Sequence, residues 1–268
     1  MKWVHRIISL IAAFVFIIPL IWMIVVSIKE EGMKVSSMVD WFTPPYSFAV
    51  YSQITGGTKL LQWVWNSFFV AGVVTVLTVL IAAMAGYAMS KIRFRFKSIM
   101  FFVILAGLLI PGEGIIIPLY QVAKDMHLLN SYQGLIFTVL ASPMAVIVLK
   151  SFFDGIPNDL IESVQIDGGG TWRIFLGIML PLTRPALASM AILTFIGSWN
   201  NFLWPFLSIT NDKFFTLPMG IPTLMSQYSE DYVKPMVINT LSSIPIIILF
   251  VIFERQIIKG ISLSGIKG

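Results

Sequence analysis

The stretch 162-ESVQIDGGGTWRIFLGIMLP-181 lies between two long apolar runs and combines charges with three consecutive glycines. Glu162, Asp167 and Arg173 carry the charges, and Pro181 closes the stretch. Glycine adopts the left-handed turn that ends many helices at little cost. The pattern therefore predicts two short helices joined by a glycine turn, placed in water between two apolar segments.

The composition indicates a membrane protein. Of 268 residues, 57% are hydrophobic and 12% charged, and the mean hydropathy is +0.88; soluble domains have about 25% charged residues. Cysteine is absent, and His5 and His127 are the only histidines. These counts exclude disulfides, Cys-ligated zinc and a catalytic or metal-binding histidine cluster. The net charge of +5 reports topology rather than nucleic-acid binding.

An all-α polytopic fold is expected, because six segments reach the ~20 apolar residues that span a bilayer. They are Ile7–Ile28, Leu61–Ser90, Ile99–Tyr120, Tyr132–Phe153, Arg184–Ile209 and Pro235–Phe253. The first resembles a signal peptide, but its apolar run exceeds the usual ~7–15 residues, so an uncleaved anchor is expected. The third is interrupted at Pro111–Gly114.

The distribution of Lys and Arg predicts the orientation. With these spans, twelve of the 18 basic residues fall on the side that carries both termini, which the positive-inside rule places in the cytoplasm. The run KIRFRFK, Lys91 to Lys97, contributes most. It is a topology determinant or, alternatively, a docking surface for a partner. The opening stretch is then cytoplasmic.

The opening stretch has the local signals of a helix start. Pro157 suits a first helical turn, and Asn158 or Asp159 can cap it. The predicted first helix has a short apolar face made of Leu160, Ile161, Val164 and Ile166. A second short helix is expected over Trp172–Leu180. Such a helix pair is a docking element or, alternatively, an interfacial loop that rests on lipid.

The spacing resembles the EAA loop of ABC importer permease subunits: Glu-Ala-Ala, three residues, Gly, nine residues, Ile, one residue, Leu-Pro. Here the pattern falls on Glu162-Ser163-Val164, Gly168, Ile178, Leu180 and Pro181, with every gap intact and both alanines replaced. The resemblance implies that the loop, at about 154–183, is a coupling helix inserted in a cleft of a cytoplasmic ATPase. The ATPase-coupling residues it implies are Glu162, Ser163, Val164, Asp167, Gly168, Ile178, Leu180 and Pro181.

The resemblance covers nearly the whole chain. The stretches FIIPLIWMIVVSIK, IPGEGIIIPLY, GSWNNFLWPFLSIT, TLPMGI and GISLSGIKG are similar to carbohydrate-uptake permeases of the maltose and glycerol-phosphate type. More narrowly, the chain resembles the shorter, six-span member of their heterodimeric pairs. This implies a type I ABC importer permease fold, with residues 1–268 forming one transmembrane domain.

The resemblance also implies partner proteins whose functions this chain does not perform itself. The sequence contains no G-x-x-x-x-G-K-[ST] phosphate loop, so ATP and Mg would be bound by a partner ATPase dimer and not by this non-catalytic subunit. A second permease subunit and an extracytoplasmic solute-binding protein are also implied. The expected location is the inner membrane of a bacterial or archaeal cell.

Polar groups at membrane depth are costly and usually face a cavity or a neighbouring helix. Candidate solute contacts are Trp199, Asn200, Trp204, Asn66, Asn239 and Glu113, with Ser142 also considered. On one continuous helix Asn200 and Trp204 share a face, and Asn201 points ~100° away. We therefore expect the Asn200–Trp204 face to meet a sugar and Asn201 to meet a helix. Structural roles for these residues, in helix packing and interfacial anchoring, stay open.

Two other classes of protein are less favoured. A stand-alone secondary carrier needs internal repeats or intramembrane carboxylates, whereas the acidic residues here cluster in loops. A membrane-embedded enzyme would need a catalytic constellation that two surface histidines do not supply. An importer permease for a non-sugar solute remains an alternative, and the sequence does not identify the sugar.

Overall fold

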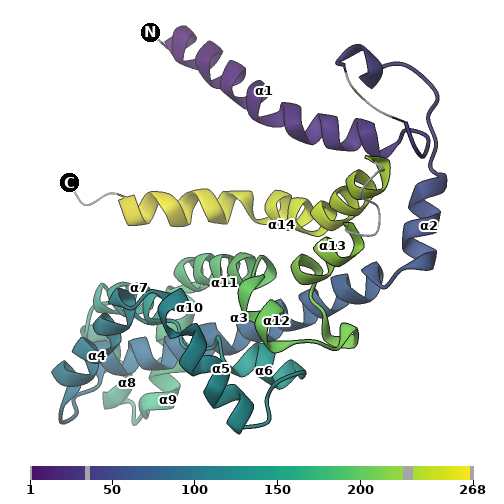
Figure 1. Cartoon of the computed structure of the whole chain (residues 1–268). Helices are drawn as coiled ribbons and strands as arrows, with labels where there is room; N and C mark the ends of the chain where they lie inside the picture. Colours follow the sequence, from purple (N-terminus) through teal and green to yellow (C-terminus); the bar gives the residue numbers. More distant parts are fainter. Residues whose placement is uncertain (1, 34–36, 226–231, 266–268) are drawn as a thin grey trace. The chain divides into compact units, whose positions relative to one another are not determined.

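The computed structural model describes residues 2–33, 37–225 and 232–265, apart from the side chains at positions 2, 249 and 255–265. In these residues the regular structure is helical (Figure 1), which confirms the predicted all-α class. An isolated β-bridge joins Lys29 and Tyr46. Lys34, Lys267 and the last residues of GISLSGIKG, which contributed to the expectations above, lie outside the described residues.

The helices follow one another along the chain with short connections. The α-helices are α1 (Lys2–Ser27), α2 (Ala49–Gly57), α3 (Leu60–Lys91), α4 (Lys97–Leu109), α5 (Ile116–Asp125), α6 (Tyr132–Phe137), α7 (Pro143–Asp154), α8 (Asp159–Ile166), α9 (Thr171–Ile174), α10 (Leu180–Leu182), α11 (Arg184–Trp199), α12 (Leu203–Ser208), α13 (Leu217–Met225) and α14 (Val233–Gly265). Three short 3-10 turns are η1 (Val39–Trp41), η2 (Gly112–Ile115) and η4 (Asp212–Phe214), and η3 (Phe175–Met179) is a π-helix.

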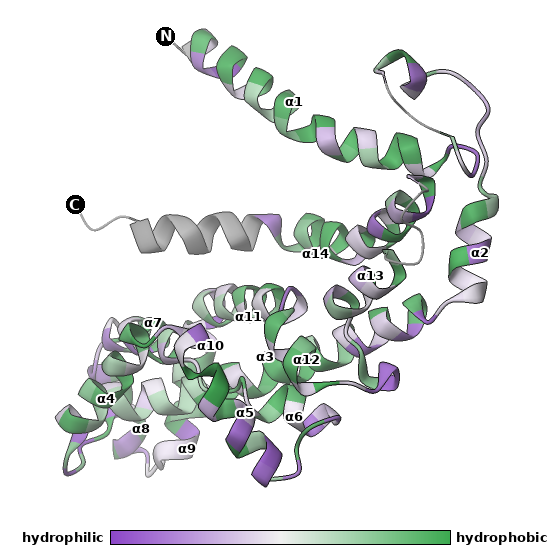
Figure 2. Cartoon of the chain, in the orientation of Figure 1, coloured by the Kyte–Doolittle hydropathy of each residue, from purple (hydrophilic) through white to green (hydrophobic). Residues whose placement is uncertain are grey.

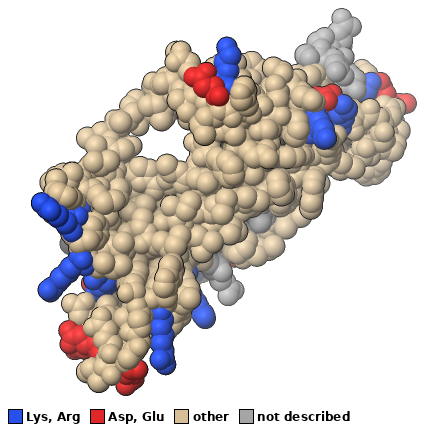
Figure 3. Space-filling model, turned by 90° about the horizontal axis from the view of Figure 1, so that it is seen from below, with Lys and Arg blue, Asp and Glu red and all other residues tan. Residues whose placement is uncertain are grey.

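Three helices match predicted spans directly. Trp3–Ser27, Leu60–Lys91 and Val233–Glu254 are each long and apolar enough to cross a bilayer. Figure 2 shows α1 as mostly hydrophobic beyond its first turns, and the face in Figure 3 has broad areas without charge. By length and composition the described residues contain three such helices, or up to five if each of two bent pairs is one span. The six-span count therefore stays a prediction.

The third predicted span is bent at the expected interruption. Lys97–Leu109 and Gly112–Asp125 meet at 98°, with Pro111 in an extended conformation between them. A proline disfavours helical geometry in the residue before it and offers no N–H. The segment Ile99–Tyr120 is consequently two helices rather than one straight span.

The prediction of a continuous helix over Tyr132–Phe153 is wrong. Helix α6 ends at Phe137 and α7 begins at Pro143, with Ser142 in an extended conformation between them. The Ser142 hydroxyl accepts a hydrogen bond from the Ala145 N–H at 3.3 Å and so caps α7. Proline at the first helical position and a serine cap favour a new start over continuation.

The prediction of a continuous helix over Arg184–Ile209 is also wrong. Helix α11 ends at Trp199 and α12 begins at Leu203. Pro205 cannot donate to the Asn201 carbonyl, so that helical bond is lost. The Asn201 side-chain oxygen instead accepts from the Trp204 N–H at 3.4 Å, which favours a break before α12.

The chain forms two compact units. The first comprises Met1–Asn66 and Phe215–Leu249, and the second comprises Ser67–Phe214 and Phe250–Gly268. In the first unit, Gly220 allows close contact with Trp63, because an added Cβ would lie 2.0 Å from the indole ring. The second unit contains a core built from α3, α7, α11 and the stretch 156–179. This core, in the second unit, positions the predicted loop.

Candidate functional site

The predicted glycine turn is present after α8. Gly168 has φ +75, and its N–H donates to the Gln165 carbonyl at 3.0 Å. The Gly169 N–H donates to the Val164 carbonyl at 2.7 Å. These two bonds are those of a Schellman motif, in which the left-handed residue follows the helix end. The expectation that Gly168 is left-handed and ends the helix is confirmed.

The second arm of the loop is helical throughout 171–182, with the π-helix η3 between α9 and α10. It continues past Leu180, where the prediction ended, and it meets α11 at an angle of 78°. Phe175 stacks on Tyr87 of α3 with the ring centroids 5.2 Å apart. The second arm is therefore packed on a membrane helix of the same chain and is not a free connector.

The loop is built into the core of its unit. Ile161, Ile174, Phe175 and Met179 are buried together with side chains of α3, α7 and α11. Val164, Ile178 and Leu180 are partly buried against the same cluster. Three predicted coupling residues, Val164, Ile178 and Leu180, thus pack against the core of this chain, and Pro181 is half-buried. Their side chains hold the loop in place.

The outward side of α8 remains available. Glu162, Ser163 and Asp167 are exposed, and Ile166 is 86% exposed. The predicted apolar face of Leu160, Ile161, Val164 and Ile166 is wrong as one surface, because the side chains divide. Ile161 and Val164 face the core, while Leu160 and Ile166 are exposed. An exposed acidic and apolar ridge on a short, well-anchored helix has the character of a docking surface.

Residues at the end of α3 hold the start of this loop, a role that sequence reasoning did not assign, since it read the run from Lys91 as a topology determinant or a docking surface for a partner. The Lys91 ammonium donates to the Ile156 carbonyl at 2.7 Å and to Asn158 Oδ1 at 2.9 Å. The Ser90 hydroxyl donates to Asp154 Oδ1 at 2.6 Å. Ser90 and Lys91 together with Asp154, Ile156 and Asn158 are called the α3 clasp below. The predicted side-chain cap from Asn158 is not made, and Asn158 has helical dihedral angles; its side-chain oxygen accepts from Lys91.

Asp154 also forms an ion pair with Lys150, one turn earlier on α7, at 2.6 Å. Burial is the largest single influence on the pKa of Asp154 and raises it, but the hydrogen bonds from Lys150 and Ser90 oppose this effect. The positive charges of Lys150 and Lys91 add to them. The pKa of Asp154 is therefore lowered, and the carboxylate is charged at neutral pH.

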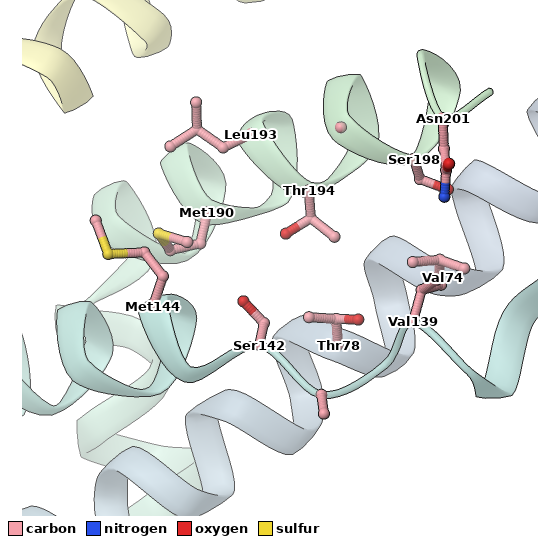
Figure 4. A pocket seen from close by; sticks show the side chains of 12 residues that line it. Val74, Thr78, Val139, Ser142, Met144, Met190, Leu193, Thr194, Ser198 and Asn201 are labelled. Atoms are coloured by element: carbon pink, nitrogen blue, oxygen red, sulfur yellow. The ribbon is translucent and has the colours of Figure 1, made fainter. Parts of the chain in front are cut away.

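A cavity of about 380 Å³ lies in the second unit between α3, α11 and the connection from α6 to α7. In Figure 4 the side chains of Thr78, Ser142 and Thr194 point into it, with Met144 and Met190 at one end and Ser198 and Asn201 at the other. Hydroxyl and amide groups can both donate and accept hydrogen bonds. The wall of this cavity therefore presents groups that suit a polyhydroxylated solute.

The predicted Asn200–Trp204 face does not exist, because the helix ends between the two residues. Asn200 is exposed, and its amide donates to the Ile196 carbonyl at 3.0 Å. Trp204 is 4% exposed, and its indole N–H donates to the Gly134 carbonyl at 3.0 Å. Trp199 is 3% exposed and stacks on Phe195. It is Asn201, expected to meet a helix, that lines the cavity.

The remaining predicted pathway residues are not among those that line this cavity. Asn66 is buried in the first unit and donates to the Phe215 carbonyl at 2.8 Å. Asn239 is half-buried in α14, and Glu113 is exposed in the turn η2. Among the considered residues, Ser142 does line the cavity. Thr78 and Thr194 were missed, because threonine in an apolar helix gives no sequence signal beyond ordinary packing.

No group of three or more His, Asp or Glu side chains that could hold a metal ion occurs in the part of the chain that the structure describes. The loop and the cavity are therefore the two features that call for comparison with known proteins.

A family model described as the inner membrane component of binding-protein-dependent transport systems matches residues 78–263. This match includes the loop, the α3 clasp and most of the cavity wall. The arabinooligosaccharides transport system permease protein of Halalkalibacterium halodurans is 33% identical over 100% of this chain and 97% of its own length. The trehalose/maltose transport system permease protein of Thermococcus litoralis is 30% identical over 97% and 95%.

The sn-glycerol-3-phosphate transport system permease protein of Brucella abortus is 33% identical over 76% of this chain and 73% of its own. A crystal structure of a bacterial ABC transporter involved in the import of the acidic polysaccharide alginate is similar in fold. Its TM-score is 0.84, at 20% identity, over 95% of both chains. The resemblance that rested on the loop spacing is thereby confirmed across the chain.

Proposed function

The chain belongs to the family of inner membrane components of binding-protein-dependent transport systems, and from this premise we propose that it is the permease subunit of an ATP-driven sugar importer. The main observation in support of the proposal is the α8 surface. Its residues Glu162, Ser163 and Ile166 are exposed, and they belong to a loop that is packed into the core. The names of the relatives, which transport arabinooligosaccharides and trehalose or maltose, support a sugar or sugar derivative as the solute.

The chain's partners supply the energy. Because the sequence has no phosphate loop, ATP and Mg are bound by a cytoplasmic ATPase dimer that receives α8 in a cleft. A second, different permease subunit completes the pathway, and an extracytoplasmic binding protein delivers the solute. Both termini, like the loop, lie in the cytoplasm. This subunit is itself non-catalytic.

Transport requires that the ATPase favour one permease conformation over the other. A ligand shifts such an equilibrium only by its differential free energy of interaction with the two states. Closure of the ATPase dimer on ATP changes the contacts of α8, and the packed loop passes this change to α3, α7 and α11, with which it shares a core. The cavity wall then alternates between outward and inward access.

The solute meets the cavity between α3 and α11. Its volume of about 380 Å³ falls in the ~300–1,000 Å³ range of small-molecule sites. Ser142, Ser198 and Asn201 offer polar atoms at its wall, and the second permease subunit contributes the opposite wall. These three residues replace Asn200 and Trp204 as our candidates for solute contact.

Reversing the charge of Glu162 tests the coupling role. We expect Glu162→Lys to insert normally but to abolish ATP-driven uptake in proteoliposomes that hold the complex purified with its partners. An interfacial charge pair that loses one partner typically costs ~3–5 kcal/mol when buried. Glu162→Gln, which keeps the size of the side chain, should have an intermediate effect.

The control variant is Asp125→Lys, which makes the same charge reversal at an exposed acidic residue at the end of α5, outside the loop. Normal uptake by Glu162→Lys would remove the coupling assignment. Uptake of a peptide or phosphonate instead of any oligosaccharide would keep the importer and reject the sugar. Uptake by wild-type protein without ATP hydrolysis would favour a secondary carrier.

A further inference from the structure

The α3 clasp joins the last turn of a long membrane helix to the entrance of the coupling loop. Lys91 is the last residue of α3, and it reaches across to a backbone carbonyl at Ile156 and a side-chain oxygen at Asn158. Asn158 immediately precedes α8. A hydrogen bond that involves an ionised group is about twice as strong as a neutral one. Lys91 therefore holds the segment that leads into α8 with two such bonds.

The topology of the protein does not require this geometry. A basic residue that only sets the orientation of a membrane protein needs to be on the cytoplasmic side and may extend freely into water. Arg93 and Arg95 in the same run are exposed in this way. Lys91 is half-buried instead, and Lys97 turns back to the Ser90 and Ile92 carbonyls at 3.1 and 3.0 Å. The two lysines thus donate hydrogen bonds to the backbone around the end of α3 and the start of the loop, whereas Arg95 lies over the ring of its neighbour Phe96.

The same helix forms part of the cavity wall. Val74 and Thr78 of α3 line the cavity, and Thr78 lies about 20 Å along the helix axis from Lys91. Helix α3 is continuous between them. The direct chain connection from the loop to α11, by contrast, passes a bend of 78° that is flanked by Pro181 and Pro185, each without a backbone N–H. A continuous helix transmits displacement along its axis more directly than such a joint.

Resting on the proposed importer function, we propose that Lys91 is a positioning residue that couples α8 to α3, so that movement of the ATPase reaches the cavity through this helix. A perturbation of this contact should therefore change transport without changing assembly. Lys91 acts through Asn158 and the Ile156 carbonyl and touches neither the solute nor ATP.

The test compares three variants in the complex purified with its partners. Lys91→Met keeps the length of the side chain but cannot donate, Lys91→Arg keeps the charge and the donors, and Arg93→Met removes one exposed charge from the same run. Copurification with the ATPase reports assembly, and solute taken up per ATP hydrolysed reports coupling. We expect Lys91→Met to assemble but to lower this ratio about fivefold or more, the size of common allosteric couplings. Lys91→Arg should recover most of it.

Arg93→Met should keep the wild-type ratio. An equal loss in Arg93→Met would assign the effect to the charge of the run, and a wild-type ratio in Lys91→Met would end the proposal. If Lys91→Met does not assemble, Asn158→Ala gives the second measurement, because it removes one acceptor and no charge. We expect a smaller loss there, and an unchanged ratio would overturn the proposal. Absence of ATP-driven uptake in the wild-type complex would instead overturn the proposed function.

Discussion

At the scale of single residues, three adjacent glycines have three different requirements. Gly168 has φ +75, and an added Cβ there would have nothing within 4 Å, so only its backbone conformation needs glycine. An added Cβ at Gly169 would lie 2.3 Å from Val164 Cγ1 and 2.8 Å from the Val164 carbonyl oxygen, so this position lacks space. Gly170 has φ −78 and nothing within 4 Å. The run GGG is therefore not three equivalent flexible positions.

Alanine at each glycine separates these requirements. Gly168→Ala should cost ~1–2 kcal/mol through left-handed strain, and Gly168→Val should cost more because its side chain is β-branched. Gly169→Ala should also destabilise the turn, since Val164 must move. Gly170→Ala, the matched control, should leave stability and ATPase copurification unchanged. Thermal unfolding and copurification measure the effects, and a Gly168→Val protein that holds its ATPase as wild type does would contradict the loop geometry.

At the scale of elements, the ends of helices decide how this chain packs. The ends of α3 and α7 are tied by Ser90 and Asp154, and Lys150 neutralises the same carboxylate. Since α7 begins at a serine cap and a proline, it is a separate short helix whose position depends on such ties. The helix breaks thus produce short helices, and specific hydrogen bonds and ion pairs hold a helix such as α7 in position.

The tie at Asp154 predicts a pH dependence with a defined sign. Because the pKa of Asp154 in the folded protein is lowered from 3.8, its contribution to stability is present above that value and is lost as pH falls through the folded pKa. Thermal unfolding in detergent should therefore show the contribution unchanged around neutral pH and lost only in strong acid. Asp154→Asn should unfold at a lower temperature at neutral pH, and the difference from wild type should shrink in acid. An equal difference at all pH values would show that the charge is not involved.

At the scale of the whole molecule, the second unit carries both the docking surface and the cavity, and the same helices support the two. The buried side chains beneath α8 come from α3, α7, α11 and the loop itself, and three of these helices or their connections also line the cavity. Closely packed interiors transmit displacement rather than absorb it. Movement at the loop is thus expected to change access to the cavity.

Introduced cysteines test which side chains meet the solute, since the chain has no cysteine of its own. In the assembled transporter, a polar thiol reagent should label Asn201→Cys, and trapped solute should reduce the labelling. Asn200→Cys, adjacent in sequence but outside the cavity, is the matched control and should show no effect of solute. Protection of Asn200→Cys alone would restore the earlier assignment. Labelling of Asn201→Cys that solute does not change would place the solute contacts in the partner subunit.

The sequence by itself determined the class, the membrane solvent, three of the spans and the turn at Gly168. Each depends on neighbouring residues only: a run of apolar side chains must be in lipid, and three glycines after a short helix end it. The loop spacing likewise identified the family, because a motif within twenty residues is a local property.

Only the tertiary structure decided which residues face the core or the cavity and which do not. Asn200 and Asn201 are chemically identical and adjacent, and the break before Pro205 reverses the roles expected from a continuous helix. Lys91 looked like one charge among several until its contacts with Ile156 and Asn158 distinguished it. Those partners are more than sixty residues away in sequence, and no local pattern encodes which distant carbonyl a side chain will meet.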